Sequence, residues 1–133
     1  MFIFFLLGLL LAANAKKITV EVVGKFLCHN NQVPVYIELR EHDWITDDLL
    51  AWTSVMTPEI FRLTGTENEM RSINPFLVIK HTCRGYPEKL IVDFGHIKRN
   101  ILVNFDELDL EEPALVKLMQ EKVIEEIRAL NWL

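Results

Sequence analysis

The sequence predicts an all-β fold, an antiparallel sandwich or barrel, followed by a C-terminal α-helix. Up to Phe105, short segments of alternating apolar and polar residues recur between turn-forming residues, which is typical of half-buried strands. Beyond Phe105, apolar residues recur at intervals of three and four instead, as on one face of a helix. Two cysteines, each on the apolar side of an expected strand, complete the pattern.

Residues 1–15 are expected to be a secretory signal peptide. They carry no charge, and a run rich in Phe and Leu ends in the small-x-small pattern Ala13-Asn14-Ala15. This run is shorter than the roughly 20 residues that a membrane-spanning helix needs. We therefore expect cleavage after Ala15, no transmembrane segment, and a secreted, extracellular mature chain that begins at Lys16.

The net charge of −5 lies entirely in the remaining chain. This charge argues against nucleic acid or an anionic membrane as the partner, because both repel acidic proteins. The length is that of one small domain. We expect residues 16–105 to form the β-domain and residues 106–133 to form an acidic linker with an amphipathic helix.

The first two expected strands lie on either side of a polar turn. In residues 16–28 every second residue from Ile18 onward is apolar or glycine. Residues 29–32 favour a turn, and residues 33–40 then alternate again. Pro34 suggests that this second strand begins there or lies at the edge of a sheet rather than at its centre.

The rest of the β-domain is expected to contain five more strands. An acidic loop at 41–48 precedes them. A polar loop that begins with glycine, at 65–74, is followed from Asn74-Pro75 by an apolar run that ends at Cys83. The expected strands cover residues 49–56, 60–63, 75–83, 89–94 and 98–105.

A helix is expected to follow the acidic residues 106–112 and to open at Pro113, because proline suits the first turn. Its apolar stripe consists of Leu115, Val116, Met119, Val123, Ile127 and Leu130. We expect the helix to pack on its own domain; a partner-binding or oligomerising helix is the alternative.

Cys28 and Cys83 are expected to form a disulfide. An even number of cysteines in an oxidising compartment favours a bridge, which would stabilise the fold by about 4 kcal/mol in the chain-entropy model. The alternative is a zinc site with His29 and His81. It is disfavoured because Cys28 and His29 are adjacent on a strand and point to opposite faces. No metal or other cofactor is expected.

The acidic loop is flanked by two tryptophans. Trp44 and Trp52 form a candidate partner surface, although the favoured prediction is that both side chains pack over the end of the sandwich. Asp43, Asp47 and Asp48 could supply oxygen ligands to Ca²⁺, but their spacing is not that of an EF-hand, and we expect a solvated loop.

Five segments, taken in order, carry a family resemblance. They are residues 23–30, 35–39, 47–51, 61–69 and 73–83, which contain Val-Gly-Lys-Phe-Leu-Cys-His-Asn, Val-Tyr-Ile-Glu-Leu, Asp-Asp-Leu-Leu-Ala, Phe-Arg-Leu-Thr-Gly-Thr-Glu-Asn-Glu and Ile-Asn-Pro-Phe-Leu-Val-Ile-Lys-His-Thr-Cys. With the signal peptide, this order resembles the nematode transthyretin-like proteins over roughly residues 16–99. The resemblance implies a secreted Greek-key β-sandwich of seven or eight strands.

The chain departs from that family in two places. The turn at residues 57–60 lacks the glycine that the family usually places there, and a helix takes the place of the usual last strands. Loss of a last strand would expose a sheet edge. The edge-to-edge dimer known from transthyretin relatives is therefore not expected here. A dimer of another kind is an open alternative, and the helix is expected to cover the exposed edge.

The resemblance implies no particular reaction, and some members of the family are thought to act as extracellular binding or bridging proteins. We expect an extracellular binding protein for a protein, lipid or small hydrophobic ligand, without catalysis, in which His81 is buried and structural. One alternative is a hydrolase: hydroxyisourate hydrolase shares the fold, but its Tyr-Arg-Gly-Ser terminus is absent here. The other is a structural secreted protein without a specific ligand. A deep apolar pocket would favour a small ligand, and a flat aromatic patch a protein partner.

Overall fold

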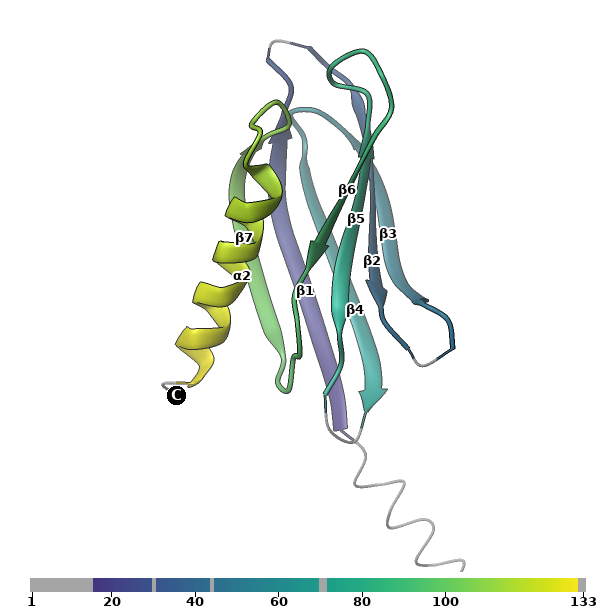
Figure 1. Ribbon diagram of the computed structural model, residues 1–133, viewed down its shortest axis with the longest axis vertical. Coiled ribbons are helices and arrows are strands. Elements are labelled where there is room, and N and C mark those ends of the chain that lie inside the picture. Colours follow the sequence, from purple (N-terminus) through teal and green to yellow (C-terminus); the bar gives the residue numbers. More distant parts are fainter. Residues whose placement is uncertain (1–15, 30, 44, 70–71, 132–133) are drawn as a thin grey trace, which may run out of the picture.

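The computed structural model describes residues 16–29, 31–43, 45–69 and 72–131. The expected signal peptide, residues 1–15, lies outside the described residues, as does Trp44. Within the described residues the chain forms seven strands and one helix, in two sheets packed face to face (Figure 1). The predicted β-sandwich with a C-terminal helix is confirmed. The elements are β1 Lys16–Leu27, β2 Pro34–Glu41, β3 Asp48–Met56, β4 Ile60–Glu69, β5 Pro75–His81, β6 Glu88–Asp93, β7 Ile101–Asp109 and α2 Leu115–Asn131.

One sheet has the strand order β4-β1-β7 and the other the order β3-β2-β5-β6. The chain crosses between the sheets after β1, β3, β4 and β6, so neighbours in a sheet are mostly not consecutive in sequence, as in Greek-key sandwiches. Strand β1 pairs antiparallel with β4 and parallel with β7. The apolar sides of the two sheets meet in one core.

In strand β1 the inward-facing positions are apolar, and one of them is a glycine. Ile18, Val20, Val22 and Phe26 are fully buried. A Cβ on Gly24 would lie 2.9 Å from the ring of Phe61, which stacks on Phe26 with its centroid 5.1 Å away. Glycine at position 24 therefore makes room for this ring pair in the core.

Strand β4 is longer than predicted. The expected loop at 65–74 was wrong over its first residues, because Gly65 to Glu69 continue the antiparallel ladder opposite Lys16 to Val20. Gly65 serves close packing instead of a turn, since a Cβ there would lie 2.8 Å from Leu39 Cδ2 and 2.8 Å from Leu50 Cβ.

Two other strand predictions need correction. The last strand is Ile101–Asp109 and not residues 98–105, because it passes through an irregularity at Asp106, where φ is 58° and the register with β1 shifts. For the second strand, the edge alternative was wrong, because β2 lies between β3 and β5, whereas the entry alternative is confirmed, because Pro34 is its first residue.

The predicted disulfide is present. Cys28 follows β1, Cys83 follows β5, their Cα atoms are 5.7 Å apart, and both residues are buried. Because β1 and β5 belong to different sheets, the bridge ties the two sheets together at one end of the sandwich.

Helix α2 packs on its own domain. Leu115, Met119 and Val123 are buried in the core cluster, and Ile127 and Leu130 pack against it. The helix contacts β7 and β6 and lies beside β7 on the side away from β1 (Figure 1). It therefore closes the flank of the sandwich where β7 has no further strand as neighbour.

We expect Met119→Ala to lower the free energy of unfolding by about 2–5 kcal/mol, because it empties a fully buried site between helix and sheets. Leu118→Ala, one residue away and 49% exposed, is the matched control and should change it by about 0.5 kcal/mol or less. Urea unfolding measures both. Equal effects would mean that the helix is not docked in solution.

Candidate functional site

The four-stranded sheet has an inner and an outer face of different chemistry. In β2, Val35, Ile37 and Leu39 point into the core, so the residues between them point outward. Directly paired residues of a ladder share a face, and the registers of β2, β3, β5 and β6 identify the remaining outward residues. This surface, called the outer face below, consists of Pro34, Tyr36, Glu38, Arg40, Leu49, Trp52, Ser54, Met56, Phe76, Val78, Lys80, Lys89, Ile91 and Asp93.

One row of paired residues crosses the middle of the outer face. Trp52 pairs with Glu38, Glu38 with Val78, and Val78 with Ile91. Trp52 is 59% exposed and Ile91 49% exposed, whereas Glu38 and Val78 are buried beneath their neighbours. The surface of this row is therefore hydrophobic, and its one charge lies underneath.

Glu38 is the centre of a hydrogen-bond network. Arg40 donates from Nε to Oε1 at 3.2 Å and from Nη2 to Oε2 at 3.0 Å, and the Tyr36 hydroxyl donates to Oε2 at 3.0 Å. The hydrogen bonds from Arg40 hold the pKa of the Glu38 carboxyl below its usual range, although burial opposes them. The charged carboxylate thus fixes the positions of both neighbours.

Large side chains contact one another beside this network. The Tyr36 ring centroid is 5.8 Å from that of Trp52, and Lys80 Nζ lies over the same Tyr36 ring at 5.7 Å. Further along, His42 stacks on Phe76 with the centroids 4.1 Å apart. These contacts hold the aromatic rings beside one another on the sheet. At the end where β2 begins, the outer face is hollowed by an open cleft of about 350 Å³, whose lining includes Pro34, Tyr36, Ser54, Lys80 and Lys89.

The outer face carries four of the ten large hydrophobic side chains that are exposed among the described residues. They are Leu49, Trp52, Met56 and Ile91. Several exposed apolar side chains on one face are typical of interaction sites.

The outer side of the three-stranded sheet is more polar. Thr19 and Thr66 approach each other at 3.0 Å through their hydroxyl oxygens, and Arg62 pairs with Glu21. This face also exposes Ile60 and Leu102, but no aromatic pair is found on it among the described residues.

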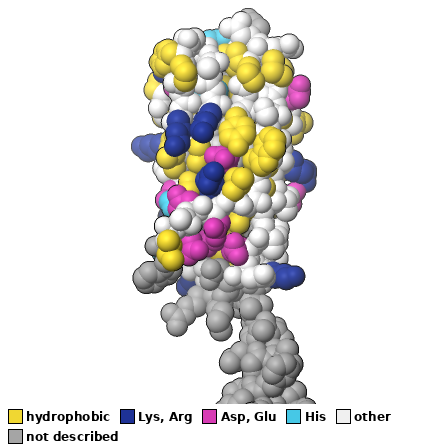
Figure 2. Space-filling view, turned by 90° about the vertical axis from the view of Figure 1, so that its right-hand side faces the viewer, with side chains coloured by type: hydrophobic (Ala, Val, Ile, Leu, Met, Phe, Trp, Pro, Cys, Tyr) yellow, Lys and Arg dark blue, Asp and Glu magenta, His cyan; other side chains and the backbone are white. Residues whose placement is uncertain are grey.

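Exposed charged groups on the outer face are separated along the strands, although the half-buried Arg40 lies in the same row as Asp93. Lys80 and Lys89 are directly paired, and Asp93 follows at the other end of β6. There His42 lies 3.1 Å from Asp47 and 3.7 Å from Asp93. Figure 2, which views the side that carries β2 and β3, shows lysine and arginine side chains higher on the molecule and carboxylates gathered lower.

The sequence-predicted site residues have different outcomes. Trp52 lies on the outer face and is exposed, so it is not packed over the end of the sandwich. Trp44 lies outside the described residues. The sulfurs of Cys28 and Cys83 are used in the disulfide, so neither is a thiolate ligand for zinc.

The acidic loop is arranged differently from the calcium alternative. Among the described residues, Asp48 comes together with Glu41 and Glu67, whose carboxylate oxygens lie within 4.8 Å of one another, and not with Asp43 and Asp47. Acidic groups of this kind are common without an ion, and we assign none.

His81 is buried beside the disulfide, as predicted. Its Nδ1 accepts a hydrogen bond from the Cys83 N–H at 3.0 Å, and its Nε2 has no hydrogen-bond partner among the described residues. Burial lowers the pKa of His81, although the carboxylate of Glu88 opposes this shift. The residue is therefore neutral near pH 7.

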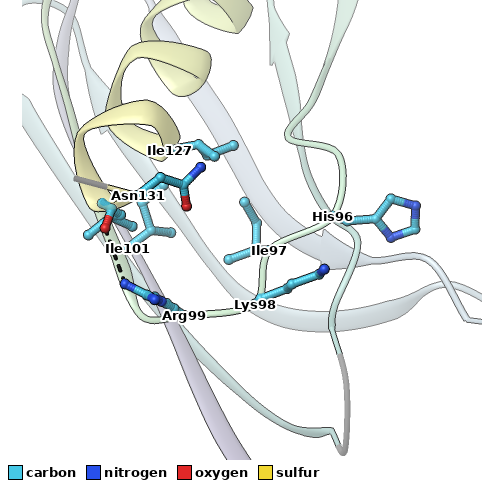
Figure 3. A pocket seen from close by; sticks show the side chains of 8 residues that line it. His96, Ile97, Lys98, Arg99, Ile101, Ile127 and Asn131 are labelled. Atoms are coloured by element: carbon cyan, nitrogen blue, oxygen red, sulfur yellow. Dashed lines mark hydrogen bonds between the residues drawn. The ribbon is translucent and has the colours of Figure 1, made fainter. Parts of the chain in front are cut away.

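A cleft of about 430 Å³ lies between the β6–β7 connection and the last turn of α2 (Figure 3). Ile97, Ile101 and Ile127 form its apolar part, and Arg99 donates from Nη1 to the Leu130 carbonyl at 3.1 Å. Lys98 and His96 are at its rim. The cleft is open and polar at its margin, unlike the deep apolar pocket that would favour a small hydrophobic ligand.

The sequence did not single out the network of Tyr36, Glu38 and Arg40. Its signal was present, because three polar residues at alternate positions of one strand must share a face. Their cross-strand neighbours Trp52 and Lys80 required the register, which alternation alone does not supply.

Fold and surface together define a small disulfide-linked β-sandwich that displays an aromatic patch on one sheet. The family model described as TTR-52, transthyretin-like family, matches residues 23–94, more than half of the chain. The chain belongs to the transthyretin-like family. The match includes the whole four-stranded sheet and ends before β7 and α2.

No curated protein and no solved structure matched in the corresponding comparisons. Among the described residues, no helix has both the length and the apolar character needed to cross a membrane.

His81→Asn should remove a pH-dependent loss of stability. The folded-state pKa of His81 lies below its unfolded value of about 6.5, so the unfolded chain binds the proton first as the pH falls. The wild type should therefore lose stability relative to the variant between pH 7 and pH 5, by at most about 1.4 kcal/mol per pH unit. The asparagine amide oxygen can still accept from the Cys83 N–H.

Urea unfolding at pH 8, 6.5 and 5.5 measures this difference. At pH 8 the imidazole is neutral in both states, so that value gives the structural cost of the substitution. If the free energies of unfolding of the two proteins changed equally with pH down to pH 5.5, the lowered pKa of His81 would be contradicted.

Proposed function

We propose that this protein is an extracellular binding domain that engages a protein partner through the outer face, without catalysis. The observation that carries the proposal is the exposed Trp52, held beside Tyr36 on a sheet whose central side chains are fixed by the Glu38 network. Tryptophan, tyrosine and arginine are the residues that most often dominate binding energy at protein interfaces.

The exposed apolar side chains of the outer face support a protein partner over a small hydrophobic ligand, because Trp52 and Ile91 project from the sheet and the hollow beside Pro34 is open to solvent. Small molecules bind in concave sites that bury most of their surface, whereas flat, exposed apolar patches are typical of protein interfaces. The side chains of this patch are already ordered by contacts with each other, so little conformational entropy would be lost on binding.

Secretion is part of the proposal. The uncharged, apolar N-terminal residues with their Ala13-Asn14-Ala15 end support signal-peptide cleavage, and the Cys28–Cys83 disulfide suits an oxidising compartment. We expect protein recovered from the medium of secreting cells to begin at Lys16 and to weigh two hydrogens less than the dithiol form. Intact-mass spectrometry with and without reductant measures both. Retention of residues 1–15, or free thiols, would contradict it.

Binding through the outer face should depend on Trp52. The secreted protein is incubated with extracellular fluid from its source, treated with a short amine-reactive cross-linker, and its covalent adducts, including adducts with itself, are quantified by mass spectrometry. Trp52→Ala should lower the yield of the specific adduct at least tenfold, since central aromatic anchors contribute roughly 2 kcal/mol or more.

Leu102→Ala is the matched control, because Leu102 is 53% exposed on the other sheet. This variant should keep the wild-type adduct yield. Equal losses in both variants, or none in Trp52→Ala, would exclude the outer face as the binding surface.

A further inference from the structure

We propose that the partner of the outer face is a second copy of this chain, joined face to face about a twofold axis. The inference rests on the proposed function of the outer face and names its partner. It comes from the way in which charges are placed about the row that contains Trp52 and Ile91.

Strand β6 carries the simplest form of this pattern. Lys89, Ile91 and Asp93 alternate on the outer face, so a cation and a carboxylate lie on opposite sides of the exposed isoleucine. At about 3.3 Å per residue, each charge is roughly 7 Å from Ile91 along the strand. The two charges are thus about equidistant from the middle of the row.

A twofold axis in the plane of the interface, running across the strands along this row, reverses the strand direction of one copy relative to the other. Ile91 then meets Ile91 of the second copy, and Trp52 meets Trp52. Lys89 of each copy lies opposite Asp93 of the other. The same patch meets itself, as in isologous interfaces, and two ion pairs form by symmetry.

The neighbouring strands agree with this arrangement except for Arg40, which shares the row of Asp93 but is half-buried and bound to Glu38 of its own chain. Lys80 extends the basic end of the outer face, and Asp47 extends the acidic end beside His42. Glu38 lies near the axis, where two like charges would meet, but it is 7% exposed and compensated by Arg40 within its own chain. The contact surface at the axis is therefore apolar, and charges of opposite sign meet on both sides of it.

The small size of the outer face favours a weak, reversible dimer. Four strands about 4.8 Å apart present a narrow surface, at the low end of areas buried in specific complexes. We expect a dimer with a dissociation constant on the order of micromolar to hundreds of micromolar, a range typical of small interfaces. Sedimentation must cover these concentrations.

The experiment is sedimentation velocity on the full secreted chain and two charge variants. Lys89→Asp places two carboxylates opposite each other at both ends of the interface, and Asp93→Lys places two ammonium groups there. Each variant alone should dimerise about tenfold or more weakly than the wild type. An equimolar mixture should form a heterodimer at least as tightly as the wild type dimerises, because opposite charges face each other again.

Two controls keep the result specific. Lys98→Asp makes the same charge change away from the outer face, at the rim of the cleft near α2, and should leave the dimer unchanged. Thermal melting of each variant checks folding, because Asp93 also accepts a hydrogen bond from the Gly95 N–H. Recovery in the mixture requires folded chains, so unfolding cannot imitate it.

The outcomes separate the two proposals. A dimer weakened by both single variants and restored on mixing supports the twofold contact. A chain that stays monomeric while Trp52→Ala still removes an adduct with another protein overturns the second copy and keeps the proposed function. A dimer insensitive to both charge variants overturns this interface. A monomer whose adducts do not depend on Trp52 overturns both.

Discussion

The carboxylate of Glu38 is the constraint on which the outer face depends. It is nearly buried on the side of the sheet that faces solvent, where an unpaired charge would be costly to desolvate. Arg40 and Tyr36 supply the three hydrogen bonds that compensate it, and both come from the same strand at a spacing of two residues. The network is therefore complete within β2 and requires no group from a neighbouring strand or a partner.

This local network has consequences across the sheet. It fixes the Tyr36 ring, and that ring supports Trp52 from β3 and Lys80 from β5. Strands β2, β3 and β5 thereby contribute to one surface whose central charge is compensated within β2 and whose central row exposes Trp52. A surface with these properties loses little hydration of polar groups when it is covered, which is what distinguishes the core of an interface from its rim.

Much of the fold could be predicted because burial imposes a period of two on strands and of three to four on a helix. The alternation in β1 and β5 placed both cysteines inward and so predicted their disulfide. The errors share a physical origin. Gly65 and the polar residues after it resemble a loop, yet their backbone groups pair with β1, and glycine is needed there for close packing with Leu50. Pro34 resembles an edge signal, but a strand can begin with proline in the middle of a sheet.

The site was less predictable than the fold because it depends on register. Period two says that Tyr36, Glu38 and Arg40 share a face, but not that Trp52 and Val78 are the neighbours of Glu38. The charge pattern of β6 could have been found, since Lys89, Ile91 and Asp93 alternate in the sequence itself. Its meaning required the structure, which shows that this face is open while α2 covers the flank of β7.

Helix α2 also bears on how this chain could associate with others. Strand β7 has a ladder with β1 on one side, and on the other side the helix contributes Leu115, Met119 and Val123 to the core. A strand added at that edge would have to displace these buried side chains, at a cost of about 1.5–3 kcal/mol for each large apolar residue exposed. Association by extending this sheet beyond β7 is therefore disfavoured, whereas covering the outer face of the other sheet would not displace the helix. Helix α2 thus protects the β7 edge from further strand pairing and leaves the outer face of the other sheet exposed.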